Sequence, residues 1–144
     1  LSSTVIKNPV DKVVNVGTKP PPALQGTGSF IYPVTGARLT TRYSRYHQAI
    51  DLAISSGTKI RASDGGTVIS SGYSGSYGYV VRINHGGNRV TLYAHCSKLL
   101  VKAGDKVYQG QHIANVGSTG RSTGPHVHFE VIINGVKRNP LDYL

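Results

Sequence analysis

Two histidines near the C-terminal end of the chain have a spacing that suits metal binding or proton transfer. They are His126 and His128, in the segment GPHVHFEV. Successive side chains of an extended strand point to opposite faces, so both imidazoles share one face while Val127, Phe129 and Val131 share the other. We therefore expect a strand with one chemical face and one core face.

A second pair, His47 and Asp51, stands much earlier in the chain, four positions apart in the segment YHQAID. This spacing lets both side chains meet at one point if the backbone between them is helical or sharply turned. Imidazole nitrogens and carboxylate oxygens are ligands that Zn²⁺ accepts, and three protein ligands with one open position are the pattern of a catalytic zinc site. Zinc remains a hypothesis, because nitrogen and oxygen ligands bind several divalent ions.

A further histidine, His95, ends a segment in which polar and apolar residues alternate. The alternation predicts a core face made of Val90, Leu92 and Ala94, and an opposite face made of Thr91, Tyr93 and His95. A side chain at the end of such a strand can reach a cleft, which makes His95 a candidate for catalysis. Cys96 is expected to point away from His95.

The elements that must position these residues are predicted to be β-strands. Short runs rich in Val, Ile, Thr and Tyr are separated by glycine turns, and no segment has sustained helical periodicity. We expect an all-β fold, an antiparallel sheet or sandwich-like domain with long glycine-rich loops. Strands are predicted near residues 30–34, 49–54, 58–62, 66–73, 78–84, 89–95, 112–116, 126–134 and 136–138.

Several connections between these strands carry their own signals. Asn134-Gly135 predicts a two-residue hairpin between the last two strands. The segment 38–46 (RLTTRYSRY) is expected to be a polar loop, either simply solvated or forming one wall of a groove. The glycine-rich segment 117–124 leads into a strand and not into a helix, which argues against a phosphate-binding loop and favours a loop that delivers His126 to a groove.

Composition limits the range of functions. The 144 residues suffice for one domain with a core that needs no disulfide, and the single cysteine excludes both an internal bridge and a four-cysteine zinc site. The formal charge of +10 favours polyanionic surroundings, such as nucleic acid, anionic lipid or an anionic cell wall. The basic residues are nevertheless dispersed, so we expect no nucleic-acid partner. No stretch approaches the ~20 apolar residues of a membrane span.

The prolines at positions 20–22 indicate a boundary between domains. We interpret residues 1–16 as the remnant of a preceding β-rich module, residues 17–28 as a linker and residues 29–144 as the main domain. The segment VVNVGTK resembles the end of the glycine-five modules of cell-wall proteins. The chain contains no methionine, which favours a processed or cloned C-terminal piece of a longer protein.

Taken together, the motifs resemble a known family. The segment HQAIDLA at 47–53, YAH at 93–95, AGDKVYQGQ at 103–111, and the glycine-rich segment ending in HVHFE at 117–130 are similar, in this order, to the lysostaphin-type (β-lytic) zinc endopeptidases. The resemblance covers roughly residues 28–144. A lone HxH motif would be weak, but the ordered set is specific. Ala49 stands where the family usually has glycine, and Cys96 where it has an aliphatic residue.

The resemblance implies roles for five residues. His47, Asp51 and His128 would bind one zinc ion per chain, and His95 and His126 would be catalytic. It also implies an antiparallel β fold with a groove over the main sheet, and peptides of bacterial peptidoglycan as substrate. We accordingly expect a secreted, cell-wall-associated metalloendopeptidase that acts as a monomer.

Other polar residues leave choices open. Glu130 shares the face of His126 and His128, and either orients one of them or pairs with a surface arginine such as Arg138, which we favour. Candidate donors for an oxyanion are Tyr43, Tyr46 and Tyr93. Of the two remaining histidines, His85 is expected to be exposed in a turn and His112 to lie at a strand edge, both outside the site.

Two alternative functions also fit parts of the sequence. A cysteine peptidase would use Cys96 with a histidine partner, although the adjacent His95 should face away from it. A catalytically silent wall-binding or regulatory module would keep the fold while a neighbouring segment, such as residues 1–28, covers the groove.

Overall fold

Ten β-strands joined by glycine-rich turns form one hydrogen-bonded sheet in the computed structural model, which describes residues 24–144. The prediction of an all-β antiparallel fold is confirmed. Two short 3₁₀ turns of the described part, η2 (Gly75–Tyr77) and η3 (Pro140–Asp142), accompany the strands. The strands are β1 (Arg38–Thr41), β2 (Ile50–Ala53), β3 (Lys59–Arg61), β4 (Gly66–Tyr73), β5 (Tyr79–Gly86), β6 (Arg89–Leu99), β7 (Lys106–Val107), β8 (His112–Val116), β9 (His126–Ile133) and β10 (Val136–Arg138).

Most predicted strands are present, and the deviations have local causes. Residues 30–34 do not form a strand: Pro33 has no N–H to donate, and Phe30 and Val34 are buried instead as anchors of an irregular segment. The segment 38–46, expected to be a loop, begins with the edge strand β1. The hairpin prediction is confirmed, since Asn134 and Gly135 both have positive φ, at 53° and 77°, between β9 and β10.

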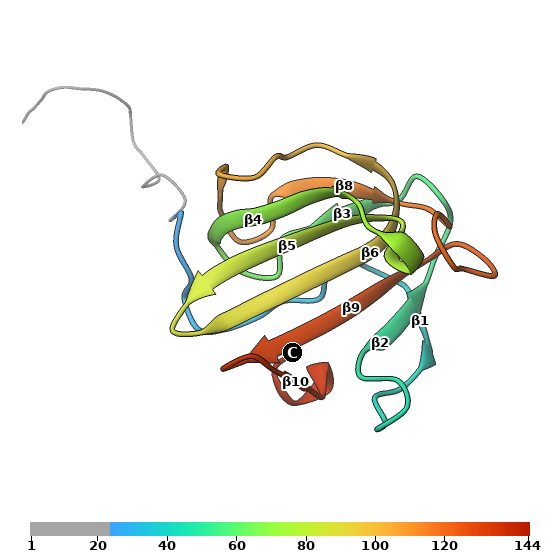
Figure 1. Cartoon of the computed structure of the whole chain (residues 1–144), viewed down its shortest axis with the longest axis horizontal. Coiled ribbons are helices and arrows are strands. Elements are labelled where there is room, and N and C mark those ends of the chain that lie inside the picture. Colours follow the sequence, from blue (N-terminus) through green and yellow to red (C-terminus); the bar gives the residue numbers. More distant parts are fainter. Residues whose placement is uncertain (1–23) are drawn as a thin grey trace, which may run out of the picture.

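The main part of the sheet has the strand order β1-β2-β9-β6-β5-β4-β7 (Figure 1). The strand β6 is the longest and changes partner along its length. It pairs with β9 up to Ala94 and with β8 from Cys96 onward, and β8 in turn pairs with β3. The sheet therefore bends at His95, and β3 and β8 form a smaller layer.

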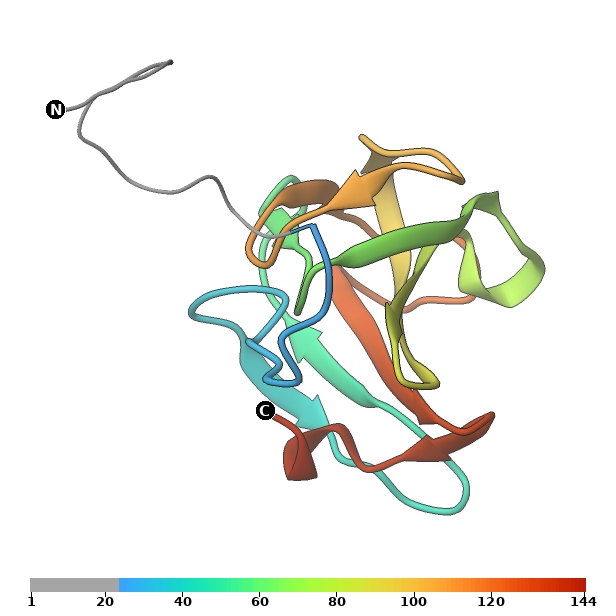
Figure 2. The ribbon, with the colours of Figure 1, turned by 90° about the vertical axis from the view of Figure 1, so that its left-hand side faces the viewer.

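The core lies between this smaller layer and the main sheet. One cluster of buried side chains joins Ile60 of β3 and Ile113 of β8 to Tyr93 and Phe129 of the central strands. Figure 2 shows β9 beside β2, as their pairing requires. The side chains of Val127, Phe129 and Val131 are all fully buried, which confirms the predicted core face of β9. Its other face is therefore the one that carries His126 and His128.

The domain boundaries remain predictions. The expected β-rich module at 1–16 and residues 17–23 of the expected linker lie outside the described residues. Within the linker, the backbone N–H groups of Thr27 and Gly28 donate to the buried carboxylate of Asp64, so this end of the segment is fastened to the domain. No helix within residues 24–144 has the length and apolar character needed to cross a membrane.

Candidate metal centre

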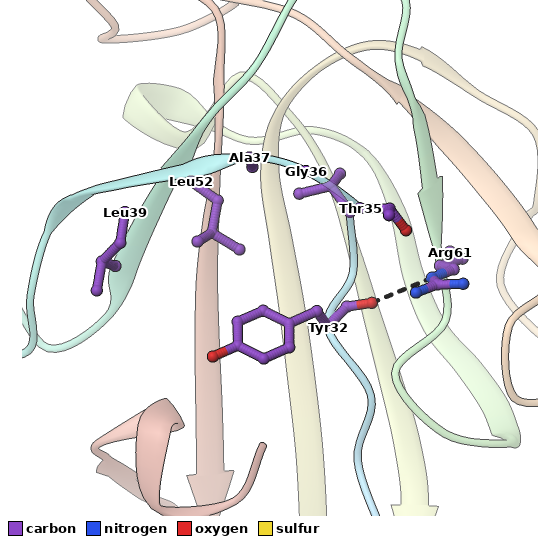
Figure 3. Close-up of a pocket in the computed structure, with 8 residues that line it drawn as sticks. Tyr32, Thr35, Gly36, Ala37, Leu39, Leu52 and Arg61 are labelled. Atoms are coloured by element: carbon purple, nitrogen blue, oxygen red, sulfur yellow. Dashed lines mark hydrogen bonds between the residues drawn. The ribbon is translucent and has the colours of Figure 1, made fainter.

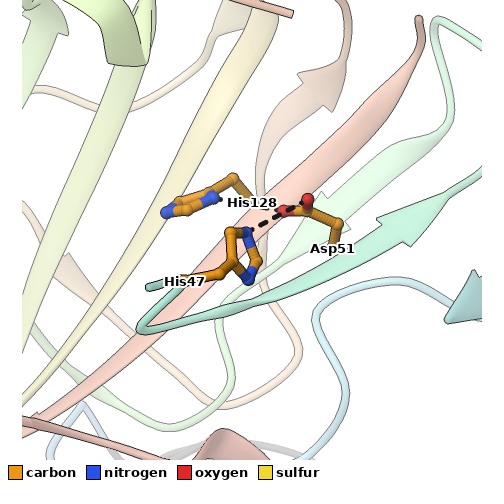
Figure 4. A group of neighbouring side chains, drawn as sticks. All are labelled: His47, Asp51 and His128. Atoms are coloured by element: carbon orange, nitrogen blue, oxygen red, sulfur yellow. Dashed lines mark hydrogen bonds and ion pairs between the residues drawn. The ribbon is translucent and has the colours of Figure 1, made fainter. Parts of the chain in front are cut away.

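The pairing of β2 with β9 brings the two polar pairs of the sequence together. In this antiparallel register Asp51 lies opposite His128, and the two side chains share one face of the sheet. The Nδ1 atom of His128 lies 3.1 Å from Oδ1 of Asp51. His47 follows a tight turn closed by its own bridge to Ser44, and its Nε2 atom lies 3.2 Å from Oδ2 of Asp51 (Figure 4).

These three side chains have the donor set of a divalent-metal site. One ligand atom from each of His47, Asp51 and His128 lies within 4.8 Å of the others. The second ring nitrogens are directed elsewhere: Nδ1 of His47 lies 3.4 Å from the carbonyl of Arg42, and Nε2 of His128 lies 2.9 Å from Glu130. Each imidazole therefore offers one nitrogen to the centre while the other is hydrogen-bonded, as is usual for metal-binding histidines.

The buried Glu130 lies behind His128 in a polar cluster. Its Oε2 atom accepts hydrogen bonds from the Tyr77 hydroxyl, at 2.7 Å, and from Nε2 of His128, and Lys137 Nζ lies 3.5 Å from Oε1. These contacts support the role in which Glu130 orients His128. The favoured pairing of Glu130 with Arg138 is wrong, because the neighbouring Lys137 is the residue of β10 that points to Glu130. Tyr77 was not predicted, since it lies in a short Gly-Ser-rich turn without a motif.

The charges of this cluster shift the ordinary pKa values. Burial acts against the charged Asp51 and Glu130 carboxylates, but hydrogen bonds from His128 and neighbouring cations outweigh it and lower both pKa values. Burial likewise disfavours a protonated His128, yet the hydrogen bonds to Asp51 and Glu130 raise the pKa of His128 to about 9. Two carboxylates thus favour positive charge at this ring, which is also what a metal cation would supply.

His95 and His126 stand next to the three ligand candidates. Their ring centroids are 4.8 Å apart, and the His95 ring lies 5.8 Å from that of His128. The Nε2 atom of His126 lies 3.7 Å from Oδ1 of Asp51. All five residues predicted for the site therefore surround one space.

That space is a cavity of about 580 Å³ on the outer face of the main sheet. Ser76, Tyr77 and the segment 120–123 complete its lining. A second cavity of about 410 Å³ adjoins it and shares Asp51, Thr123 and His126, so an open groove continues past the candidate metal centre.

A separate cavity of about 420 Å³ lies elsewhere on the domain (Figure 3). It is lined mainly by small and apolar residues, among them Leu39 and Leu52, and Arg61 donates to the carbonyl of Tyr32 at its rim. No histidine or carboxylate lines it. Asp51 and Leu52 are neighbours in β2, and their side chains face different cavities, so the strand separates the chemical site from this apolar pocket.

Comparison with known proteins decides the family. The sequence profile described as Peptidase family M23 matches residues 45–140, which include all five site residues. The chain belongs to peptidase family M23. It is 40% identical over 110 residues to the peptidoglycan DD-endopeptidase ShyC of Vibrio cholerae, covering 76% of this chain and 24% of that protein. It is 41% identical over 129 residues to the DD-carboxypeptidase/endopeptidase Mpg of Neisseria meningitidis, covering 82% of this chain and 30% of that protein.

A solved structure agrees with the resemblance seen in the sequence. The antimicrobial peptidase lysostaphin from Staphylococcus simulans matches the M23 domain with a TM-score of 0.70 and 31% identity, over 75% of this chain and 49% of that chain. The lysostaphin-type family prediction is therefore confirmed. The chain spans less than a third of the length of the two curated relatives, 24% of ShyC and 30% of Mpg.

Several finer predictions about the M23 domain were wrong. On β6 the faces are reversed up to Ala94: Tyr93 is fully buried in the main core, and Leu92 and Ala94 lie on the groove side beneath Tyr77. His95 lines the groove, as predicted. The Tyr93 hydroxyl is occupied inside the core by Ser63 and Thr91, so it is no oxyanion donor. Both faces of this central strand are covered, which is why alternation alone assigned them incorrectly.

The other two tyrosines proposed as oxyanion donors also have other positions. The hydroxyl of Tyr43 donates to the carbonyl of Lys137, and Tyr46 is 86% exposed with its hydroxyl bonded to Arg45. Neither lines the cavity that contains the five histidine and aspartate side chains. Tyr77 is the tyrosine that lines this cavity.

Two further histidines lie outside the site, as expected, but one in an unexpected environment. His112 begins β8 and bonds the side chain of Asn115. His85 is only 4% exposed, not an exposed turn residue, because its ring bonds the carbonyl of Gly65 and the hydroxyl of Thr91. Burial lowers the pKa of His85, so the ring is neutral in the folded state near neutral pH.

Cys96 does not fit the cysteine-peptidase alternative. Its side chain is fully buried in the main core and contacts the carbonyl of Tyr93. Burial raises the pKa of the Cys96 thiol to about 12, which leaves almost no thiolate at neutral pH. Cys96 also points away from the groove that contains His95, as predicted.

Proposed function

We propose that this M23 domain is a zinc-dependent endopeptidase that hydrolyses peptide bonds of bacterial peptidoglycan. The observation that carries the proposal is the convergence of His47, Asp51 and His128 in a groove that also contains His95 and His126. Two nitrogen donors and one carboxylate match the ligand sets of catalytic zinc sites. Zinc is therefore the metal we propose, with these three residues as its ligands.

When bound there, zinc supplies Lewis acidity, which lowers the pKa of a water molecule towards ~7 and polarises a scissile carbonyl. The residues of the chain supply the proton transfer. Both His95 and His126 lie close enough to the ligand candidates for one imidazole to accept a proton from the attacking water and return it to the leaving amine. Until it returns that proton, the protonated ring donates a hydrogen bond to the oxyanion as negative charge develops.

The shape of the groove favours cleavage within a chain. Cavities of about 580 Å³ and about 410 Å³ lie on the two sides of Asp51 and His126, so a peptide can continue in both directions from the centre. Arg121 lines one cavity and Arg38 the other, and both side chains are exposed. These positive charges suit a substrate that carries carboxylates.

ShyC is named a peptidoglycan DD-endopeptidase and Mpg a DD-carboxypeptidase/endopeptidase, so we propose a DD-crosslink as the preferred bond. The charge of +10 supports retention at an anionic cell wall, and we propose that the protein acts there, outside the cytoplasm, as a monomer.

The decisive experiment is digestion of purified peptidoglycan from walls of different crosslink chemistry, followed by mass spectrometry of the fragments. The full chain loaded with one zinc ion is expected to release fragments cut at a crosslink. His128→Ala should lose both zinc and hydrolysis, whereas His112→Ala, a histidine outside the cavity, should retain both. If the wild-type chain binds one zinc ion but cuts none of these walls, the proposal is refuted in favour of a silent wall-binding module.

A further inference from the structure

The segment 117–124, called here the 117–124 loop, contacts the ring nitrogens of both candidate catalytic histidines. Nδ1 of His95 lies 2.7 Å from the carbonyl oxygen of Thr119, and Nδ1 of His126 lies 2.9 Å from the carbonyl oxygen of Gly124. A carbonyl oxygen only accepts hydrogen bonds, so each Nδ1 must carry the hydrogen. In a neutral ring the lone pair is then on Nε2.

The side chain of Thr119 fastens this loop to the neighbouring strands. Its hydroxyl donates to the carbonyl of Cys96, at 2.6 Å, and accepts from the backbone N–H of Tyr79, at 3.1 Å. The hydroxyl of Thr119 thus bonds Cys96, the residue after His95, and the backbone carbonyl of Thr119 bonds His95 itself. The two contacts fix the distance between the loop and the His95 ring.

Close backbone packing supports the same placement. A Cβ atom on Gly78 would lie 2.5 Å from the carbonyl carbon of Thr119, and one on Gly120 would lie 2.3 Å from the nitrogen of Gly78. The N–H of Arg121 also donates to the carbonyl of Ser76, at 2.8 Å. The loop therefore lies directly against the turn before β5, without intervening side chains.

The backbone of His95 needs such support. Its φ of 65° places a non-glycine residue in the left-handed region, a conformation that persists only where surrounding contacts determine it. The ring of His95 has one hydrogen bond among the described residues, the one to Thr119. Removing the anchor of Thr119 should therefore release the ring while the rest of the site stays intact.

We propose that Thr119 is a positioning residue, which holds His95 as the Nδ1–H tautomer and leaves its Nε2 atom free to accept a proton. Proton transfer by His95 rests on the proposed function, whereas the assignment of its tautomer does not. Thr119 is neither a ligand candidate nor part of the cavity lining, so it acts through His95.

The test compares Thr119→Val, which removes the hydroxyl and keeps the shape, with Thr119→Ser, which keeps the hydroxyl and removes the methyl group. The tautomer of His95 is read from ¹⁵N ring shifts and two-bond ¹H–¹⁵N correlations of the zinc-loaded full chain. Spectra are recorded at about pH 8, above the ordinary imidazole pKa of ~6.5. The ring signals of His95 are assigned as those that are absent from the spectrum of His95→Gln.

In the wild type and in Thr119→Ser we expect a protonated Nδ1 and an unprotonated Nε2. In Thr119→Val we expect a mixture of both tautomers. The same valine variant should lower kcat on peptidoglycan roughly 10- to 100-fold, while KM and zinc stoichiometry stay unchanged. The loss does not exceed the lower end of what general acid–base catalysis contributes, because the imidazole is still present.

Three results would overturn the inference: a wild-type spectrum with the hydrogen on Nε2 of His95, a valine variant with the wild-type tautomer and kcat, or a serine variant as impaired as the valine variant. The wild-type spectrum decides the tautomer even if Thr119→Val does not fold. A wild-type chain with the expected tautomer and bound zinc, but without hydrolysis, would refute the proposed function and leave the assignment of the tautomer standing.

Discussion

Replacing Glu130 by glutamine is expected to weaken zinc binding about 10- to 100-fold. Glu130 is 2% exposed, and its Oε2 atom accepts from both His128 Nε2 and the Tyr77 hydroxyl. A glutamine oxygen can accept the same bonds but is neutral, and a hydrogen bond to a charged group is worth about 1 to 1.5 kcal/mol more than a neutral one. That difference alone corresponds to about tenfold in affinity.

A second effect acts in the same direction. The other carboxylate oxygen, Oε1 of Glu130, lies 3.5 Å from the ammonium group of Lys137. In Glu130→Gln the amide nitrogen takes one of the two oxygen positions and places a donor against a donor, either at Lys137 or at His128. Where the amide nitrogen faces His128, it pushes the ring from the orientation that directs Nδ1 to Asp51, which accounts for the upper part of the range.

The assay is competition for zinc between the protein and a chelating dye at constant pH. Tyr77→Phe, which removes one of the two hydrogen bonds to Oε2, should fall between the wild type and Glu130→Gln. The matched control is Asp64→Asn, another buried carboxylate, which binds the backbone N–H groups of Thr27 and Gly28. It should lower the thermal stability without changing the zinc affinity.

Unchanged zinc affinity in Glu130→Gln would refute the reasoning. So would an equal loss in Asp64→Asn, because the effect would then be one of general stability. Hydrolysis by Glu130→Gln should largely return when zinc is raised to saturation, since Glu130 bonds the ligand candidate His128 and does not line the cavity.

Three further predictions concern the core. The Cys96 thiol, fully buried and with its pKa raised to about 12, should resist iodoacetamide at neutral pH until urea unfolds the chain, and Cys96→Ala should retain the hydrolysis that His128→Ala loses. Burial lowers the pKa of His85, so the unfolded chain binds this proton first, and stability should fall as the pH drops below ~6.5 and level off below the folded pKa. His85→Gln should remove this part of the pH dependence in urea titrations. Phe129→Ala should cost about 3 to 5 kcal/mol in the same titrations, and Phe129→Leu clearly less.

The sequence was sufficient to predict which side chains face the core where a strand is regular and one of its faces is exposed. On β9 the alternation assigned Val127 and Phe129 to the core and His126 and His128 to the groove, and the structure agrees. Residue type and spacing also selected His47 and Asp51. What local patterns cannot give is the pairing of β2 with β9, because the two strands are far apart in the chain and their register depends on the packed core.

Failures occurred where the environment overrides the local pattern. Tyr77 was missed because a tyrosine in a glycine-rich turn has no spacing that distinguishes it from an exposed residue. His85 was misjudged for a related reason: a histidine beside two glycines reads as a turn, but here β5 continues through it and its two ring nitrogens find partners in the core. Contacts across the fold, and not neighbours in the sequence, decide both positions.

The backbone at His95 links the fold to the proposed chemistry. Regular alternation after Tyr93, which faces the core, and Ala94, which faces the groove, would direct residue 95 back to the core. The positive φ of 65° at His95 breaks the alternation, so that two consecutive residues face the groove and Cys96 returns to the core. At the same residue β6 leaves β9 and begins to pair with β8. One left-handed residue, at a cost of about 1 to 2 kcal/mol, therefore turns the strand into the second layer and brings an imidazole to the candidate metal centre, which explains why the bend and the histidine occur at one position.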